Sequence, residues 1–166
     1  MAKSTFLGRV VAQSDTEISF WEHFLSQREF ARIVEFGTYR GNFSLYLYLY
    51  CLQNKKEFYT YDNQDWKSLD KRQHLKNKLG FDKHFKLCDI FEIESEIGEL
   101  ISSPGLSIVF CDNGNKPEEL KIFSKYLKSG DIIVSHDWLT EVREKDLPYN
   151  LEVIATSHDS IFLKRL

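Results

Sequence analysis

Hydrophobic residues recur along the chain in short runs that alternate between strand-like and helix-like spacing. Five apolar runs have the length of a buried strand, and segments with helical periodicity separate them. The strand-like runs are ARIVEFG (31–37), EFYTYDN (57–63), HFKLCDI (84–90), LSIVFCDN (106–113) and DIIVSHDW (131–138). Alternation of this kind predicts a parallel sheet covered by helices on both faces.

The helix-like segments span 14–29, 69–80, 91–103, 116–130 and 139–147. The first begins with Ser14 as a candidate N-cap and Glu17 three residues later. The fourth has Pro117 in its first turn and a terminal glycine, as helices often do. These start and stop signals support a strand–helix alternation through most of the chain.

The segment NFSLYLYLYCLQ (42–53) is ambiguous because leucine and tyrosine alternate in it. Period-two alternation normally indicates a half-buried strand. Here both residue types are largely apolar, so no polar face is defined. The later elements require crossover helices, so we predict a helix that is buried all round.

The end of the chain predicts a β-hairpin. LEVIAT (151–156) and SIFLKRL (160–166) flank a short SHD turn. The predicted fold is therefore α/β and Rossmann-like, with a doubly wound, mostly parallel, seven-stranded sheet, a C-terminal antiparallel hairpin and helices on both faces. We expect one domain over 1–166, made of an N-terminal helix (14–29), a core (32–138) and a closing hairpin (151–166).

Composition and charge predict the compartment and the kinds of partner of the protein. Charged residues make up 28% of the chain and the net charge is −3, so we expect no nucleic-acid partner. The basic stretch 71–78 is interpreted as a solvated helix face. No apolar run reaches the ~18 residues of a membrane span, and the N-terminus lacks a signal-peptide pattern. Cys51, Cys88 and Cys111 are interpreted as reduced core cysteines, which predicts a cytoplasmic protein.

Each of the five predicted parallel strands ends near an acidic residue. Successive acids lie about 25 residues apart, close to the length of a strand–helix repeat. They are Glu35, Asp62, Asp89, Asp112 and Asp137. All strands of a parallel sheet point the same way, so these carboxylates should gather at the carboxyl edge, where open α/β sheets bind ligands. The alternative for each single acid is a cap on the following helix.

The glycine turn GTYRG (37–41) separates the ligand classes. It is neither the G-x-G-x-x-G of dinucleotide folds nor a phosphate-binding loop. Glu35 stands just before it, where a carboxylate would repel a pyrophosphate. The helix start at 42–44 offers free N–H groups suited to a carboxylate. A ligand with a cationic centre, a carboxylate and a ribose fits these features, and S-adenosylmethionine (SAM) is one.

These motifs resemble those of class I SAM-dependent methyltransferases. VEFGTYRGNFS resembles the family's first motif, YTYDN its second and LCDIF its third. The resemblance implies that SAM is the cofactor. It implies cofactor-binding roles for Glu35, Gly37, Thr38, Gly41, Asp62, Asn63, Asp89, Ile90 and Asp112. Tyr61 is a further candidate for the pocket wall, and Trp66 for its rim.

Within that family the chain is most similar to the macrocin-type sugar O-methyltransferases and the cephalosporin hydroxylase-like proteins. The resemblance implies a divalent metal such as Mg²⁺, held by Asp112 and Asp137, that would acidify the acceptor hydroxyl. It implies a catalytic group of His136, Asp112 and Asp137, with His136 as a base or metal ligand. The chain departs from the branch at Asn115, where a histidine is usual.

The predicted function is methyl transfer from SAM to a hydroxyl oxygen of a small molecule. The alternative is a non-catalytic domain that kept the fold and the cofactor pocket. A third hypothesis is another Rossmann-like enzyme that uses the same edge. Because 138–150 leaves little chain for a lid, we expect the N-terminal helix, with Trp21 and Phe24, or a second subunit of a homo-oligomer to cover the acceptor.

Overall fold

The computed structural model describes residues 5–69 and 74–166. A seven-stranded sheet runs through its centre in the order β5-β4-β3-β6-β7-β9-β8. Five strands are parallel, and β9 pairs antiparallel with both β7 and β8. The strands are β3 (Arg32–Phe36), β4 (Glu57–Asp62), β5 (Phe85–Leu87), β6 (Ser107–Cys111), β7 (Ile132–His136), β8 (Leu151–Thr156) and β9 (Ser160–Arg165). The predicted fold class is confirmed.

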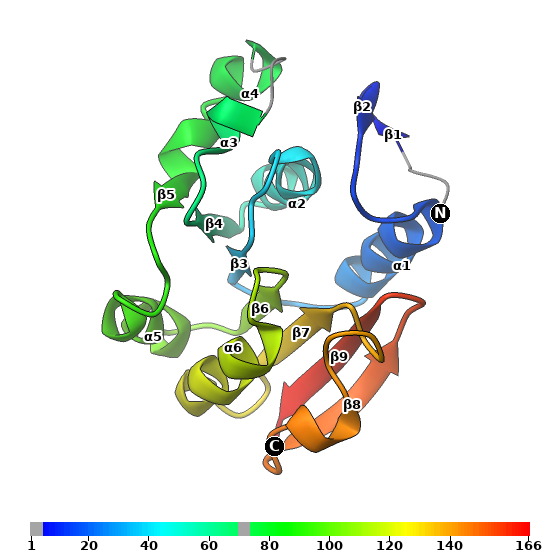
Figure 1. The fold of residues 1–166 in the computed structure, drawn as a ribbon, viewed down its shortest axis with the longest axis vertical. Coiled ribbons are helices and arrows are strands. Elements are labelled where there is room, and N and C mark those ends of the chain that lie inside the picture. The colour runs from blue at the N-terminus through cyan, green and yellow to red at the C-terminus, as the bar shows by residue number, and fades with distance from the viewer. Residues whose placement is uncertain (1–4, 70–73) are drawn as a thin grey trace.

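Helices cover both faces of the sheet (Figure 1). They are α1 (Asp15–Ser26), α2 (Asn42–Gln53), α3 (Trp66–Leu69), α4 (His74–Lys78), α5 (Glu94–Ser102) and α6 (Lys116–Phe123). Short 3₁₀ helices span Phe81–His84, Ser124–Tyr126 and Glu144–Asp146. None of the helices in the described ranges is long and apolar enough to cross a membrane.

Two hydrophobic clusters explain why the buried strands carry apolar residues on both sides. In β6, Ile108 and Phe110 face the cluster under α1 and α2, whereas Val109 and Cys111 face the cluster under α5 and α6. Trp21 and Phe24 of α1 are 0% and 2% exposed and pack in the first cluster. They belong to the core and do not form the lid that we expected.

The ambiguous segment 42–53 is the helix α2, with Asn42 to Tyr48 and Cys51 buried. Its helical form is therefore confirmed, and its burial on all sides of the first two turns explains the uniformly apolar composition. Cys51 and Cys111 are buried and Cys88 is half-buried, and all three are free.

Several predicted boundaries were wrong. The first helix ends at Ser26 and not at residue 29, and the helix starting at Lys116 ends at Phe123, before a 3₁₀ turn. The predicted helix 139–147 contains only the 3₁₀ helix Glu144–Asp146. The predicted helix 69–80 lies partly outside the described residues; α4 covers His74–Lys78 of it. An N-terminal hairpin of β1 (Thr5–Phe6) and β2 (Arg9–Val10) was not predicted.

Candidate functional site

A cavity of about 570 Å³ lies at the carboxyl edge of the parallel strands. Its walls come from the turn before α2, from the ends of β4, β6 and β7, and from the N-terminal segment 10–13. Four of the five strand-end acids line it: Glu35, Asp62, Asp112 and Asp137. The parallel strands thus bring together carboxylates that are far apart in the sequence.

The glycine turn takes its shape from the neighbouring strands. Gly37 has φ +99°, and a Cβ there would lie 2.3 Å from the carbonyl oxygen of Asp112. Its N–H donates to the carbonyl oxygen of Tyr61, 2.8 Å away. Gly37 is therefore required by its close approach to the segment after β6. Gly41, in the left-handed region at φ +63°, is the N-cap of α2 and does not line the cavity.

Asp62 is fixed by two backbone N–H groups. Its Oδ2 accepts from Tyr39 N at 2.7 Å, and its Oδ1 accepts from Gln64 N at 2.8 Å. Tyr39 adopts φ +48° to make its contact. Each carboxylate oxygen keeps a further lone pair. Asp62 therefore presents a rigid acceptor at the cavity wall.

Glu35 is a buried carboxyl group that lines the cavity. The hydroxyl of Thr60 donates to it at 2.6 Å, and Thr60 in turn contacts the hydroxyl of Thr38 at 2.6 Å. Burial and, to a lesser extent, the charges of Asp112 and Asp62 raise the pKa of Glu35 to about 8, although the hydroxyl groups of Ser44 and Thr60 lower it. Glu35 therefore holds a proton at neutral pH until a cation approaches.

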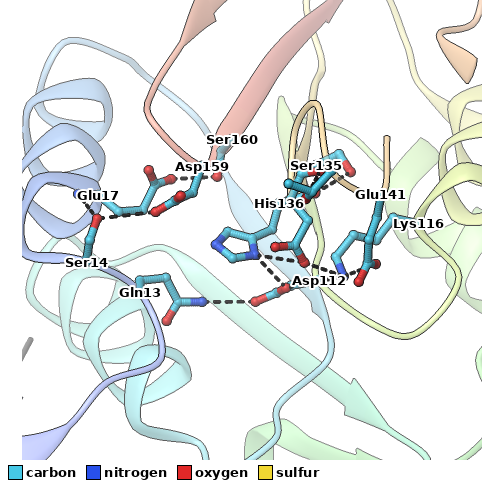
Figure 2. Close-up of polar contacts among 12 residues, drawn as sticks. Gln13, Ser14, Glu17, Asp112, Lys116, Ser135, His136, Glu141, Asp159 and Ser160 are labelled. Atoms are coloured by element: carbon cyan, nitrogen blue, oxygen red, sulfur yellow. Dashed lines mark hydrogen bonds and ion pairs between the residues drawn. The ribbon is translucent and has the colours of Figure 1, made fainter. Parts of the chain in front are cut away.

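Asp112, His136 and Asp137 lie together at the cavity wall and form what we call the acidic cluster. Figure 2 shows Asp112 beside His136. The Nδ1 atom of His136 lies 3.2 Å from Oδ1 of Asp112 and 3.3 Å from Oδ2 of Asp137. Gln13 donates to Oδ2 of Asp112 at 2.9 Å. The Nε2 atom of His136 is buried and has no hydrogen-bond partner within the described part of the chain.

The charges of the acidic cluster are strongly coupled. Burial alone would lower the pKa of His136, but its hydrogen bonds and charge contacts with Asp112 and Asp137 raise it to about 10. The hydrogen bond from His136 and the nearby Lys116 hold the pKa of Asp137 well below its usual range. Burial raises the pKa of Asp112. At neutral pH the cluster therefore holds a protonated His136 beside the carboxylate of Asp137.

Lys116 completes this charge network. Its ammonium nitrogen lies 2.8 Å from Asp137 Oδ2, 2.9 Å from Glu141 Oε2 and 3.8 Å from Asp112 Oδ1. Burial lowers the pKa of Lys116, but the hydrogen bonds to Asp137 and Glu141 raise it above the usual value overall. A permanent cation therefore sits against the carboxylates that we predicted to bind a metal.

Lys116 opposes the binding of a divalent metal at this cluster, although the ligand atoms of Asp112, His136 and Asp137 lie within 4.8 Å of one another. Mg²⁺ binds oxygen at about 2.1 Å. An ion on the Asp137 oxygen, itself 2.8 Å from the Lys116 nitrogen, would lie at most about 5 Å from the ammonium group. At an effective dielectric constant of about 20 the repulsion is ~7 kcal/mol.

Of the predicted cofactor residues, six line the cavity: Glu35, Gly37, Thr38, Asp62, Asn63 and Asp112. Asp89 and Ile90 do not line it. Asp89 is exposed and accepts a hydrogen bond from Phe91 N, and Ile90 is buried in the core under α5 and α6. Tyr61 packs in that same core. Their contact with an adenine ring stays a prediction.

Two other residues considered in the sequence, Trp66 and Asn115, do not line the cavity. Trp66, expected at the rim, is 0% exposed and packs edge-on against Phe81. Asn115 is the N-cap of α6. Val10, Val11, Ala12 and Gln13 also line the cavity. Neither they nor Lys116 were predicted from the sequence as site residues. One hint of this segment was present in the sequence, because Gln13 is a polar residue directly before the Ser14 N-cap.

Comparison with known proteins identifies the fold. No family model and no curated protein matches the chain. A SAM-dependent O-methyltransferase from Thermotoga maritima has a TM-score of 0.65 at 17% identity, over 96% of this chain and 68% of that one. A SAH-bound methyltransferase from Podospora anserina has a TM-score of 0.60 at 16% identity, over 93% and 80%. A protein called cmcI, with SAH, has 0.64 at 12%, over 98% and 81%. The chain thus has the fold of SAM-dependent methyltransferases.

Proposed function

We propose that this chain transfers a methyl group from SAM to a hydroxyl oxygen of a small molecule. The observation that supports this most is one cavity at the strand edge that is lined by acids from four adjacent strands. Asp62 and Glu35 lie on the side of β4 and β3, and His136 with its two aspartates lies on the side of β6 and β7. The first side suits a cationic cofactor with a ribose, and the second suits an acceptor that must lose a proton.

The cofactor side would recognise SAM by charge and hydrogen bonding. Glu35 supplies a carboxyl group that ionises beside a cation. Asp62, fixed by Tyr39 N and Gln64 N, accepts from ribose hydroxyls. The N-terminus of α2 follows the glycine turn and offers N–H groups for the carboxylate of the methionine part. Structural neighbours of the same fold carry SAH, which supports SAM as the cofactor.

SAM supplies an electrophilic methyl group on its sulfonium, so the protein must orient the acceptor and take its proton. Asp112 is the candidate base, because burial raises the pKa of its carboxyl group, whereas His136 is already protonated at neutral pH. The Nδ1 atom of His136 is held by Asp112 and Asp137. The imidazolium would therefore position the Asp112 carboxylate and stabilise the negative charge that develops on the acceptor oxygen.

The N-terminal segment forms part of the cavity wall. Val10, Val11, Ala12 and Gln13 line it, and the carbonyl oxygen of Val10 accepts a hydrogen bond from the Asn42 side chain at 2.8 Å. These residues add apolar surface beside the polar cluster. The acceptor we propose therefore has an apolar body and at least one hydroxyl group.

Calorimetric titration with SAM tests the proposed function. We expect saturable binding with a dissociation constant below about 1 mM. Asp62→Ala should lose this binding, whereas Asp82→Ala, outside the cavity, should keep it. Absence of binding to the wild-type protein at millimolar SAM would contradict the proposal. SAM binding without methyl transfer to any member of a hydroxylated acceptor library would favour the non-catalytic alternative, which structural neighbours such as the T. maritima enzyme do not support.

A further inference from the structure

Lys116 is a buried cation at the start of α6, where a cation is electrostatically unfavourable. The N-terminus of a helix carries a partial positive charge, so a lysine there is disfavoured unless carboxylates surround it. Its side chain is only 5% exposed. Asp112, Asp137 and Glu141 all direct carboxylate oxygens at its nitrogen, at 3.8, 2.8 and 2.9 Å. The carboxylates therefore account for both the position and the burial of this lysine.

The loop after β7 is shaped around the Lys116 ammonium group. Asp137 adopts φ +57°, in the left-handed region, and its carbonyl oxygen accepts from Thr140 N at 3.1 Å and Glu141 N at 2.9 Å. This turn brings the Glu141 carboxylate back to Lys116 (Figure 2). The contact thus joins α6 to the loop that carries the acidic cluster's second aspartate.

We propose that the ammonium group of Lys116 serves as the fixed cation of the acidic cluster, in the place of a divalent metal ion. It neutralises Asp137 and Glu141 directly and lies near Asp112. A tethered ammonium group gives the cluster a positive charge without the open coordination positions that a metal would offer to an acceptor.

This inference bears on the acceptor that the proposed function requires, and in that respect it rests on the proposed function. A divalent ion favours an acceptor with two adjacent hydroxyl groups, because both oxygens can bind the ion. Lys116 directs its donors to Asp137 and Glu141 and offers no chelation. An acceptor with a single hydroxyl should therefore react as well as its counterpart with two adjacent hydroxyls.

Titration with Mn²⁺, followed by the electron paramagnetic resonance signal of the free ion, tests the proposal without cofactor or acceptor. We expect the wild-type protein to show no stoichiometric Mn²⁺ site below about 1 mM. Lys116→Met should create a site at least about tenfold tighter, because the ammonium group that repels the ion from Asp137 and Glu141 is removed while His136 is the same in both proteins. The matched control is Lys121→Met on the same helix, where the lysine is 67% exposed and pairs with Glu118; it should behave as wild type.

Two outcomes would overturn the proposal. One is a stoichiometric Mn²⁺ site in the wild-type protein that Asp137→Asn removes. The other is a folded Lys116→Met protein, judged by its circular dichroism and cooperative melting, that still binds no Mn²⁺. If Lys116→Met does not fold, the wild-type titration still tests the proposal, because it needs no variant. SAM titration of the same preparation reports separately on the proposed function.

Discussion

Glu35 combines two properties that rarely occur together in one side chain, full burial and contact with a ligand-sized cavity. Its pKa of about 8 means that it is mostly protonated at pH 7. A sulfonium bound nearby would stabilise the carboxylate and lower that pKa. Binding of SAM should therefore release a proton at neutral pH, and SAM affinity should increase as the pH rises from 6 to 8.

Calorimetry in two buffers with different ionisation enthalpies measures that proton. At pH 7 we expect release of a substantial fraction of one proton per SAM bound by the wild-type protein. Glu35→Gln, which cannot ionise, should bind SAM without release. Glu29→Gln is a surface control, since the Glu29 side chain is 96% exposed. Equal binding heats in both buffers for the wild-type protein would show that Glu35 is not coupled to the cofactor.

Gly37 is required by the backbone that packs against it and not by contact with a ligand. Gly37→Ala would force an alanine to φ +99° and place its Cβ 2.3 Å from the Asp112 carbonyl oxygen. We expect a loss of ~2–4 kcal/mol in the free energy of unfolding, from strain and overlap together. Urea denaturation measures it.

Gly114→Ala is the matched control for Gly37→Ala. Gly114 also lines the cavity, but a Cβ there would meet no atom within 4 Å. Its free energy of unfolding should stay within about 0.5 kcal/mol of wild type or rise slightly. If Gly37→Ala were equally harmless, the close approach of the glycine turn to the segment after β6 would be refuted.

At the scale of elements, one buried carboxyl group fastens α1 to the C-terminal hairpin. Glu17 is fully buried and accepts from Trp21 Nε1 at 3.2 Å, from Ser157 Oγ at 2.5 Å and from Ser160 Oγ at 2.5 Å. The sequence suggested Glu17 as half of a capping box with Ser14. Only Ser14 acts as a cap, accepting from Glu17 N at 3.2 Å, and the Glu17 side chain turns inward.

Ser160→Ala tests this fastening. Removing one of three donors leaves the buried Glu17 less well satisfied, so the free energy of unfolding should fall by ~1–3 kcal/mol in urea. Ser26→Ala is the control, because the exposed Ser26 hydroxyl donates only within its own helix, to the carbonyl oxygen of His23, and should change stability by less than about 0.5 kcal/mol. A Ser160→Ala protein as stable as wild type would mean that Glu17 does not depend on this hydroxyl.

The elements that sequence patterns predicted well are those whose residues are buried on a regular period. The strand runs around Val34 and Val109 are buried on both faces, so their apolar composition alone identified them. The hairpin of β1 and β2 was missed because its strands have two residues each, too short to show any period. Val11 is buried only through tertiary packing.

The site was predictable to the extent that it depends on strand ends. Asp62 is the last residue of β4, and Asp112 directly follows β6, so the parallel register places both at one edge. Asp89 lies two residues beyond the short β5, which ends at Leu87, and so falls outside the cavity wall. Lys116 could not be assigned from sequence, because its contacts depend on the turn that carries Glu141 back toward α6.

At the scale of the whole molecule, three buried groups bind protons more tightly in the folded chain than in the unfolded chain. Burial raises the pKa of Glu35 to about 8 and that of Glu119 to about 7 from 4.5, and the aspartates raise that of His136 from 6.5 to about 10. In each case the folded chain holds a proton over a pH range in which the unfolded chain has lost it. The free energy of unfolding therefore falls as the pH rises through these ranges.

We accordingly expect the protein to be less stable at pH 9 than at pH 6 by more than about 1 kcal/mol, in urea denaturation at constant ionic strength. Asp137 acts in the opposite direction. Its pKa is lower in the folded chain than in the unfolded chain, so it adds stability at neutral pH, and this stability is lost only in acid. Glu35→Gln should flatten the decline between pH 6 and 8 and leave the decline above pH 8, which belongs to His136. If the stability stayed constant or rose from pH 6 to 9, these groups would not be protonated in the folded chain. The release of a proton from Glu35 on SAM binding would then not be expected either.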